Sequence, residues 1–116
     1  MKQTVFVDQM NRRVAIAERP KRIVSLVPSI TELLHYFSLD MEVIGITKFC
    51  VHPDDWFLTK DRVGGTKNLK LTSIRELNPD LIIGNKEENT ESDIDSLAED
   101  LPVWMTDVNN FDDALD

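Results

Sequence analysis

The chain has little of several residue types, and each shortage excludes a class of protein. Its 116 residues include one cysteine, Cys50, so no internal disulfide can form and a disulfide-built fold is excluded. Four glycines and five prolines are too few for a collagenous chain. No apolar run approaches the roughly 20 residues of a membrane-spanning helix. Residues 1–14 also lack the long apolar segment of a signal peptide, so we expect neither membrane insertion nor a signal peptide here.

Basic residues are also scarce, which argues against a nucleic-acid partner. The chain has 13 Lys and Arg against 21 Asp and Glu, a formal net charge of −8, whereas nucleic-acid binding needs a basic face. Residues 86–116 hold eleven acids and one base, Lys86. Such an acidic segment is typical of a solvated helix surface, and the alternative is a docking surface for a basic partner.

The apolar pattern predicts strands that alternate with helices. Hydrophobic residues make up 41% of the chain, enough for one globular domain with a core. Two β-prone runs, 4–7 and 13–17, flank turn residues and predict a hairpin. Continuous apolar runs predict four buried strands at 23–27, 43–46, 81–84 and 103–106.

Apolar residues at helical spacing lie between these strands. We expect the inward faces of three helices to hold Ile30, Leu33, Leu34, Phe37, Ile74, Leu77, Ile94, Leu97, Ala98 and Leu101. Long crossovers between strands predict parallel pairing. The predicted fold class is therefore α/β: a Rossmann-like lobe with a central, about four-stranded parallel sheet flanked by helices, preceded by a short N-terminal β-hairpin. We assign residues 1–20 to the hairpin and 21–116 to the lobe.

Polar residues predict where the helices begin. Ser29 with Glu32, and Ser73 with Glu76, have the spacing of capping boxes. Thr90 is a candidate N-cap for the third helix. A further helix is expected to begin near Phe111.

The loops after the strands are the expected ligand-binding edge. In an open parallel sheet, the crevice lies outside the carboxyl ends of the strands. Some candidate residues follow these strand ends directly, and others lie in a nearby loop that contains Gly64 and Gly65, which we call the glycine loop. Together they are Ser29, Lys48, Phe49, Gly65, Thr66, Lys67, Asn85, Lys86 and Glu87. We predict that they bind the ligand, with simple solvation of the lysines as the alternative.

Catalytic signatures are absent from the sequence. It contains no GxxxxGK[ST] phosphate loop, no GxGxxG and no nucleophile–base pair at a recognisable spacing. We therefore predict that the protein is not an enzyme and has no intrinsic cofactor. Cys50 and His52 are candidate metal ligands, although two ligands are too few for a structural zinc site. The alternative is a buried thiol beside a helix start at Pro53.

Several of these segments together resemble a known family. Residues 20–33, PKRIVSLVPSITEL, are similar to the opening of a class III periplasmic binding protein domain, the family of iron-siderophore and cobalamin receptors of ABC importers. The glycine loop at 63–65 and the segment 74–83, IRELNPDLII, also match. The resemblance covers roughly residues 13–116 and implies the N-terminal of two lobes, which are bridged by one long helix that would start near the end of this chain.

The family implies a ligand, a partner and a location. The ligand would be a small-molecule metal chelate, either a ferric siderophore, haem or cobalamin. Phe49 offers a flat ring for it, and Lys48, Lys67 and Lys86 would attract an anionic chelate. Cobalamin-binding members place a tryptophan where Thr66 stands.

The implied partner is an ABC permease in the membrane. Family members often dock on it through a glutamate at the position of Thr72, so Glu76, one turn further on, is the candidate docking residue. The implied location is periplasmic or at the cell surface, and the missing signal peptide leaves a cytoplasmic location open.

Two other functions remain open. One is a metal-handling enzyme domain that uses the same lobe with Cys50 and His52 as ligands. The other is a cytoplasmic metal-chelate sensing or interaction module that uses the acidic C-terminal third. We also expect the isolated lobe either to self-associate, as a homodimer, through Phe111 and Leu115 or to keep an exposed apolar patch there, because contiguous exposed apolar surface recruits partners.

Overall fold

The computed structural model describes residues 3–7, 13–17, 20–48 and 54–106. Several residues that the sequence singled out lie outside these ranges, namely Phe49, Cys50, His52, Pro53, Phe111 and Leu115.

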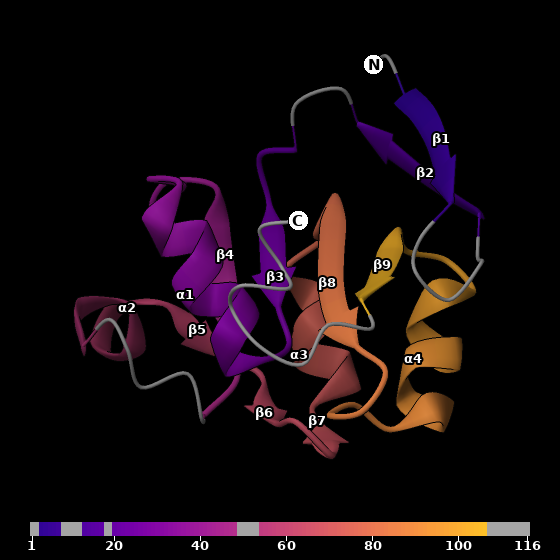
Figure 1. Cartoon of the computed structure of the whole chain (residues 1–116). Coiled ribbons are helices and arrows are strands. Elements are labelled where there is room, and N and C mark those ends of the chain that lie inside the picture. The colour runs from indigo at the N-terminus through magenta and orange to yellow at the C-terminus, as the bar shows by residue number, and fades with distance from the viewer. Residues whose placement is uncertain (1–2, 8–12, 18–19, 49–53, 107–116) are drawn as a thin grey trace.

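The central sheet has five parallel strands, one more than predicted. Its order is β5-β4-β3-β8-β9, and every neighbouring pair is parallel (Figure 1). The strands are β3 (Ile23–Ser25), β4 (Val43–Ile46), β5 (Asp61–Arg62), β8 (Leu81–Asn85) and β9 (Val103–Thr106). The α/β prediction is confirmed. The sequence missed β5 because its two residues are charged and exposed, and because backbone pairing with Gly45 and Ile46 alone defines the strand.

Two hairpins accompany the sheet. The predicted N-terminal hairpin is confirmed, with β1 (Gln3–Val7) antiparallel to β2 (Arg13–Ala17). The glycine loop, for which no strand was predicted, forms a second hairpin from β6 (Gly64–Gly65) and β7 (Asn68–Leu69). Gly64 has φ +97°, and a Cβ there would lie 2.7 Å from the Asn68 carbonyl oxygen, so only glycine fits without strain.

Helices cover both faces of the sheet and divide the core into two clusters. α1 (Pro28–Tyr36) and α2 (Asp54–Thr59) pack on one face through Ile30, Leu34 and Trp56. α3 (Leu71–Glu76) and α4 (Glu91–Ala98) pack on the other through Ile74, Ile94 and Leu97. Successive strand residues alternate between the two clusters, as Ile23 and Val24 do, because side chains of a strand point to opposite faces.

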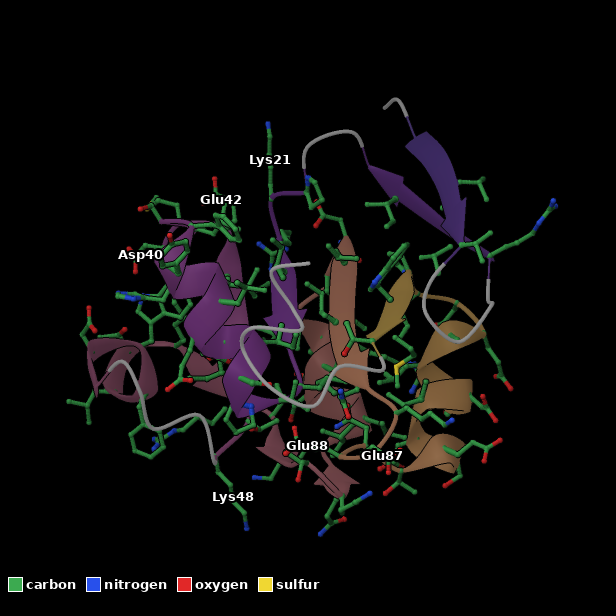
Figure 2. The ribbon with its side chains drawn as sticks, viewed as in Figure 1. Lys21, Asp40, Glu42, Lys48, Glu87 and Glu88 are labelled. Atoms are coloured by element: carbon green, nitrogen blue, oxygen red, sulfur yellow. The ribbon has the colours of Figure 1, made fainter. Side chains whose placement is uncertain are left out.

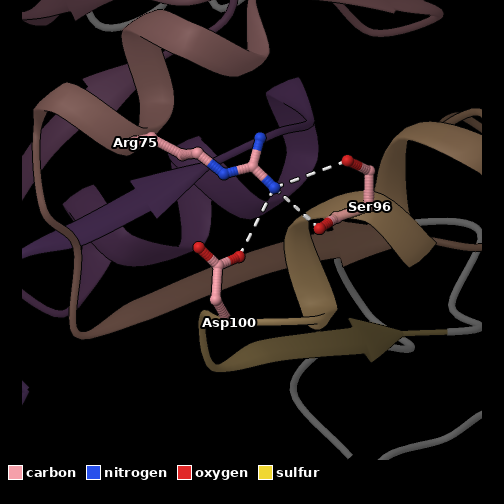
Figure 3. Close-up of polar contacts among 3 residues, drawn as sticks. All are labelled: Arg75, Ser96 and Asp100. Atoms are coloured by element: carbon pink, nitrogen blue, oxygen red, sulfur yellow. Dashed lines mark hydrogen bonds and ion pairs between the residues drawn. The ribbon is translucent and has the colours of Figure 1, made fainter.

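An arginine connects the two helices of the second face. Arg75 Nη2 donates to the Ser96 carbonyl oxygen at 2.8 Å and lies 3.4 Å from the Asp100 carboxylate (Figure 3). Arg75 belongs to α3, whereas Ser96 lies in α4 and Asp100 just beyond it. The contact therefore fixes α3 beside α4 under the sheet.

The predicted capping boxes are wrong. α1 begins at Pro28, one residue before Ser29, and its N-cap is Val27, which has no side-chain acceptor. α3 begins at Leu71, so Ser73 lies inside it. Thr90 is the N-cap of α4 as predicted, but its hydroxyl donates to the Lys67 carbonyl oxygen at 3.0 Å and makes no cap bond.

The predicted inward face of α1 needs a correction. Ile30 and Leu34 are buried, but Leu33 is half-buried and Phe37 is 56% exposed. Phe37 is the C-cap residue of α1, beyond the last helical residue Tyr36, and its side chain is exposed although its N–H still bonds the Leu33 carbonyl oxygen at 3.1 Å. The inward residues predicted for α3 and α4 do pack in the core. Among the described helices, none is long and apolar enough to cross a membrane.

Candidate functional site

The carboxyl ends of the strands meet at one edge of the sheet, which we call the carboxyl edge. Lys48, Glu87 and Glu88 lie at this edge in Figure 2, whereas Asp40 and Glu42, which precede β4, lie at the opposite edge together with Lys21. The β6–β7 hairpin also belongs to the carboxyl edge, because Lys48 N donates to the Gly64 carbonyl oxygen at 2.8 Å. Four chain segments far apart in sequence therefore border one surface. They are the segments after β3 and β4, the β6–β7 hairpin and the loop after β8.

Asn89 joins three of these segments. Its side chain is buried, and its Oδ1 accepts from Asn85 N at 2.8 Å. Its Nδ2 donates to the Leu26 carbonyl oxygen at 3.2 Å and to the Thr66 carbonyl oxygen at 3.0 Å. One amide thus connects the segment after β3, the β6–β7 hairpin and the loop after β8. Sequence reasoning missed Asn89 as a site residue.

Asn85 shapes the loop after β8 from within. Its Oδ1 accepts from Glu87 N at 2.8 Å and Glu88 N at 3.3 Å, which is the geometry of an Asx turn. Its Nδ2 donates to Thr106 Oγ1 at 3.2 Å, and Thr106 Oγ1 donates to the Gly84 carbonyl oxygen at 2.9 Å. Two asparagines four positions apart after an apolar strand were the available sequence signal for this locked turn.

Lys67 fastens the hairpin to the same loop from the outside. Its Nζ donates to the Glu87 carbonyl oxygen at 2.6 Å. The Thr90 hydroxyl donates to the Lys67 carbonyl oxygen, and Asn89 donates to the Thr66 carbonyl oxygen, so the turn Thr66–Lys67 is held at three points. One of the Lys67 ammonium donors is therefore already hydrogen-bonded within the protein, although the side chain is exposed.

The other predicted ligand-binding residues differ in exposure. Lys48, Lys86 and Glu87 are exposed at the carboxyl edge. Ser29 and Thr66 are half-buried, and Gly65 is buried. The structure therefore brings the described members of the predicted set to one edge. Their role in binding stays a prediction. Phe49, which was also predicted to bind the ligand, lies outside the described residues.

The predicted docking and metal residues are not brought to this group. Glu76 is exposed at the end of α3, and α3 leads from the carboxyl edge back to the opposite one, so Glu76 lies away from the candidate site. Within the described residues, no group of three or more His, Cys, Asp or Glu side chains is placed to hold a metal ion. Cys50 and His52 lie outside those residues.

The arrangement suits binding of a small molecule. Backbone and amide hydrogen bonds hold the loops in place, and no buried side-chain N or O atom in the described part of the chain lacks a partner. Two exposed cations, Lys48 and Lys86, and two exposed acids, Glu87 and Glu88, remain on the surface. Preformed loops with a few polar groups are typical of a ligand site.

Comparisons with known proteins point to one group. No protein-family model matches the chain. The chain is 32% identical, over 85 residues, to the ABC transporter substrate-binding lipoprotein YvrC of Bacillus subtilis (strain 168), covering 73% of this chain and 26% of that protein. It is 26% identical, over 95 residues, to the vitamin B12-binding protein of Pectobacterium carotovorum subsp. carotovorum (strain PC1), covering 81% of this chain and 34% of that protein.

A solved structure supports the same grouping. The structure of Staphylococcus aureus SirA complexed with staphyloferrin B superposes with a TM-score of 0.74 at 25% identity, covering 90% of this chain and 37% of that one. The chain thus spans about a quarter to a third of the length of the two curated relatives.

Proposed function

The chain belongs to the class III periplasmic binding protein family, in which it corresponds to the N-terminal lobe, and we propose that it forms one wall of a cleft that captures a small-molecule metal chelate for an ABC importer. The observation that carries this proposal is the convergence of loops at the carboxyl edge, held together by Asn89. A fixed edge of this kind can face a second lobe across a ligand without rearranging, which lowers the entropic cost of binding.

The chemical class of the ligand follows from the relatives and from the exposed charges. The relatives include a vitamin B12-binding protein, and the similar SirA structure is a complex with staphyloferrin B; vitamin B12 is a metal complex and staphyloferrin B a metal chelator. Lys48 and Lys86 are exposed at the carboxyl edge and favour an anionic chelate. Thr66 stands where cobalamin-binding members place a tryptophan, so we rank ferric siderophores and haem ahead of cobalamin.

The partner and location follow from the same proposal. A binding protein of this family hands its ligand to an ABC permease and works outside the cytoplasmic membrane, in the periplasm or at the cell surface. The relatives are binding proteins of transporters. We therefore propose capture without chemical conversion of the ligand.

The test is a binding screen with defined probes. The chain, and in parallel the longest product of its gene, is titrated with haemin, ferric staphyloferrin B and cyanocobalamin, and binding is followed by calorimetry. The metal-free chelator and free ferric citrate are the matched ligand controls. We expect at least one chelate to bind with one-to-one stoichiometry, more tightly to the longer product if that product adds a second lobe. Failure of all the chelates with both proteins would contradict the proposal.

Variants then locate the site of the chelate that binds. Phe49→Ala, Lys67→Ala and Lys86→Ala should each weaken binding, and the lysine effects should shrink as salt rises. Lys21→Ala is the control, since Lys21 is an exposed lysine at the opposite edge of the sheet (Figure 2). If these three variants bind normally while Cys50→Ser or His52→Ala abolishes binding, the site is a direct metal site and the predicted cleft is wrong.

A further inference from the structure

A groove with basic walls lies beside the carboxyl edge, on the flank of the sheet formed by β5. It has a volume of about 690 Å³ and runs between the end of α2, strand β5 and the β6–β7 hairpin. Among the described residues, its walls carry the four cations Lys48, Lys60, Arg62 and Lys70 and one acid, Asp61. We call this feature the basic groove. Lys48 and Gly65 are its border with the candidate ligand site.

The four cations are not equivalent. Lys60 Nζ donates to the Asp40 carbonyl oxygen at 2.5 Å, lies 3.8 Å from the Asp40 carboxylate and sits 4.6 Å from the centroid of the Trp56 ring. Its charge is therefore largely balanced within the protein. Arg62 and Lys70 are exposed, and the Arg62 guanidinium lies 4.8 Å from the centroid of the Phe57 ring, which restrains it against α2. Lys48 is also exposed but belongs to the candidate ligand site, so Arg62 and Lys70 are the exposed cations of the groove that lie outside that site.

The positive charge of the basic groove contrasts with the negative net charge of the whole chain. The chain carries a net charge of −8. The opposite flank of the sheet is acidic, since α4 and its ends carry Glu91, Asp95, Glu99 and Asp100 at exposed positions. β5 and β9 are the two ends of the strand order, so the basic and acidic flanks are separated by the full width of the sheet. A local basic surface on an acidic protein recognises a local acidic surface and steers its approach.

We propose that the basic groove is a docking site for a protein partner that presents a short, extended acidic segment. The groove is large and open, and its cations come from different elements, so it suits several carboxylates along a chain better than one compact anion. β5 is an edge strand of the sheet, and the side away from β4 pairs with no other described strand. An extended segment can therefore lie along β5 with its acids against Arg62 and Lys70.

The net charge disfavours large polyanions as occupants. A nucleic acid or an anionic membrane would be long enough to meet the acidic flank as well as the groove, and so would be repelled by the exposed acids of α4. A short acidic segment meets only the charges within about one Debye length, roughly 8–10 Å at physiological salt. Charge complementarity therefore selects a protein segment among the anionic partners.

The test uses a fluorescently labelled tetra-glutamate peptide, about 13 Å long when extended, and the full chain, with binding measured by fluorescence anisotropy at low salt. We expect the peptide to bind weakly and one to one, and the double variant Arg62→Gln, Lys70→Gln to bind at least about five-fold more weakly, with the affinity of both proteins falling as salt rises. Lys21→Gln is the matched control and should bind like the parent chain. Thermal unfolding of each variant checks that the fold is retained, and Lys70→Gln alone serves if the Arg62 change disturbs packing on Phe57.

Three outcomes would overturn the proposal. The first is no peptide binding at low salt, and the second is equal loss of binding in the Lys21→Gln control. The third is tighter, groove-dependent binding of an oligonucleotide, an anionic phosphatidylglycerol vesicle or inorganic phosphate than of the peptide. None of these measurements involves a metal chelate. Results that contradict the docking proposal would therefore not contradict the proposed chelate capture.

Discussion

The side-chain amide of Asn89 donates to the carbonyl oxygen of Thr66 at 3.0 Å, although the two residues are 23 positions apart. This bond places the turn of the β6–β7 hairpin against the loop after β8. Since Asn89 also bonds Leu26 and Asn85, its loss should loosen three segments of the carboxyl edge together.

Replacing Asn89 tests this connection. Asn89→Leu keeps most of the side-chain volume but removes all three hydrogen bonds and leaves buried polar groups without partners. We expect a loss of about 2–3 kcal/mol in the free energy of unfolding, measured by urea denaturation. Asn68→Ala, at an exposed position of β7, should cost less than about 0.5 kcal/mol. Equal effects at the two positions would mean that the amide network contributes little.

Gly84 is coupled to the same network. A Cβ at Gly84 would lie 2.8 Å from Asn89 Oδ1 and 3.0 Å from Met105 Sδ, so Gly84→Ala should displace the amide and cost about 1–3 kcal/mol. Because both changes disrupt one contact, the double variant Gly84→Ala, Asn89→Leu should lose less stability than the two single losses added together. Strict additivity in a double-mutant cycle would show that the two sites are independent.

Asp80 holds the start of the sheet at the opposite edge. Its carboxylate accepts from Lys21 N at 2.8 Å and from Arg22 N at 2.9 Å, just before β3 begins. We expect Asp80→Ala to lower the free energy of unfolding by about 1–3 kcal/mol, as for hydrogen bonds to a charged group. Asp80→Asn, which keeps one acceptor oxygen, should lose less. Glu99→Ala, at the exposed end of α4, is the control and should change the urea midpoint very little.

Core and boundary residues of similar size should differ in their effect on stability. Ile82 is fully buried, so Ile82→Ala should cost about 2–5 kcal/mol. Leu33 is half-buried, so Leu33→Ala should cost clearly less than Ile82→Ala. Phe37→Ser, at a residue that is 56% exposed, should leave stability within about 0.5 kcal/mol. Thermal unfolding of the three variants would contradict this placement if Phe37→Ser were as damaging as Ile82→Ala.

Much of the fold could be predicted because its signals are local. The apolar runs that became β3, β4, β8 and β9 each report burial on both faces, and helical spacing correctly predicted the buried Ile94 and Leu97. The capping boxes failed because a spacing of three residues also occurs inside a helix, where Ser73 lies. Strand β5 was not predicted because its pairing uses backbone groups and its side chains are charged.

The candidate site could be predicted only in outline. Lys48, Lys86 and Glu87 each follow a strand end, and this was enough to predict correctly that they lie at one edge of the sheet. Position could not show that Lys67 bonds the Glu87 carbonyl oxygen, or that Asn89 is the residue connecting three segments. The reason is that a carbonyl partner carries no side-chain signal in the sequence.

Local patterns in the sequence were enough to predict four of the five sheet strands, the alternation of strands and helices, and the family, because each of these depends on residues close together in the chain. Three relationships appear only in the folded chain: which loops touch, which lysine is already hydrogen-bonded, and that Arg62 and Lys70 share a groove on an acidic protein. These relationships join residues across hairpins and crossovers. They exist only once parallel pairing has brought distant strand ends to one edge, since a hydrogen bond or a local charge field depends on distance in space and not on separation along the chain.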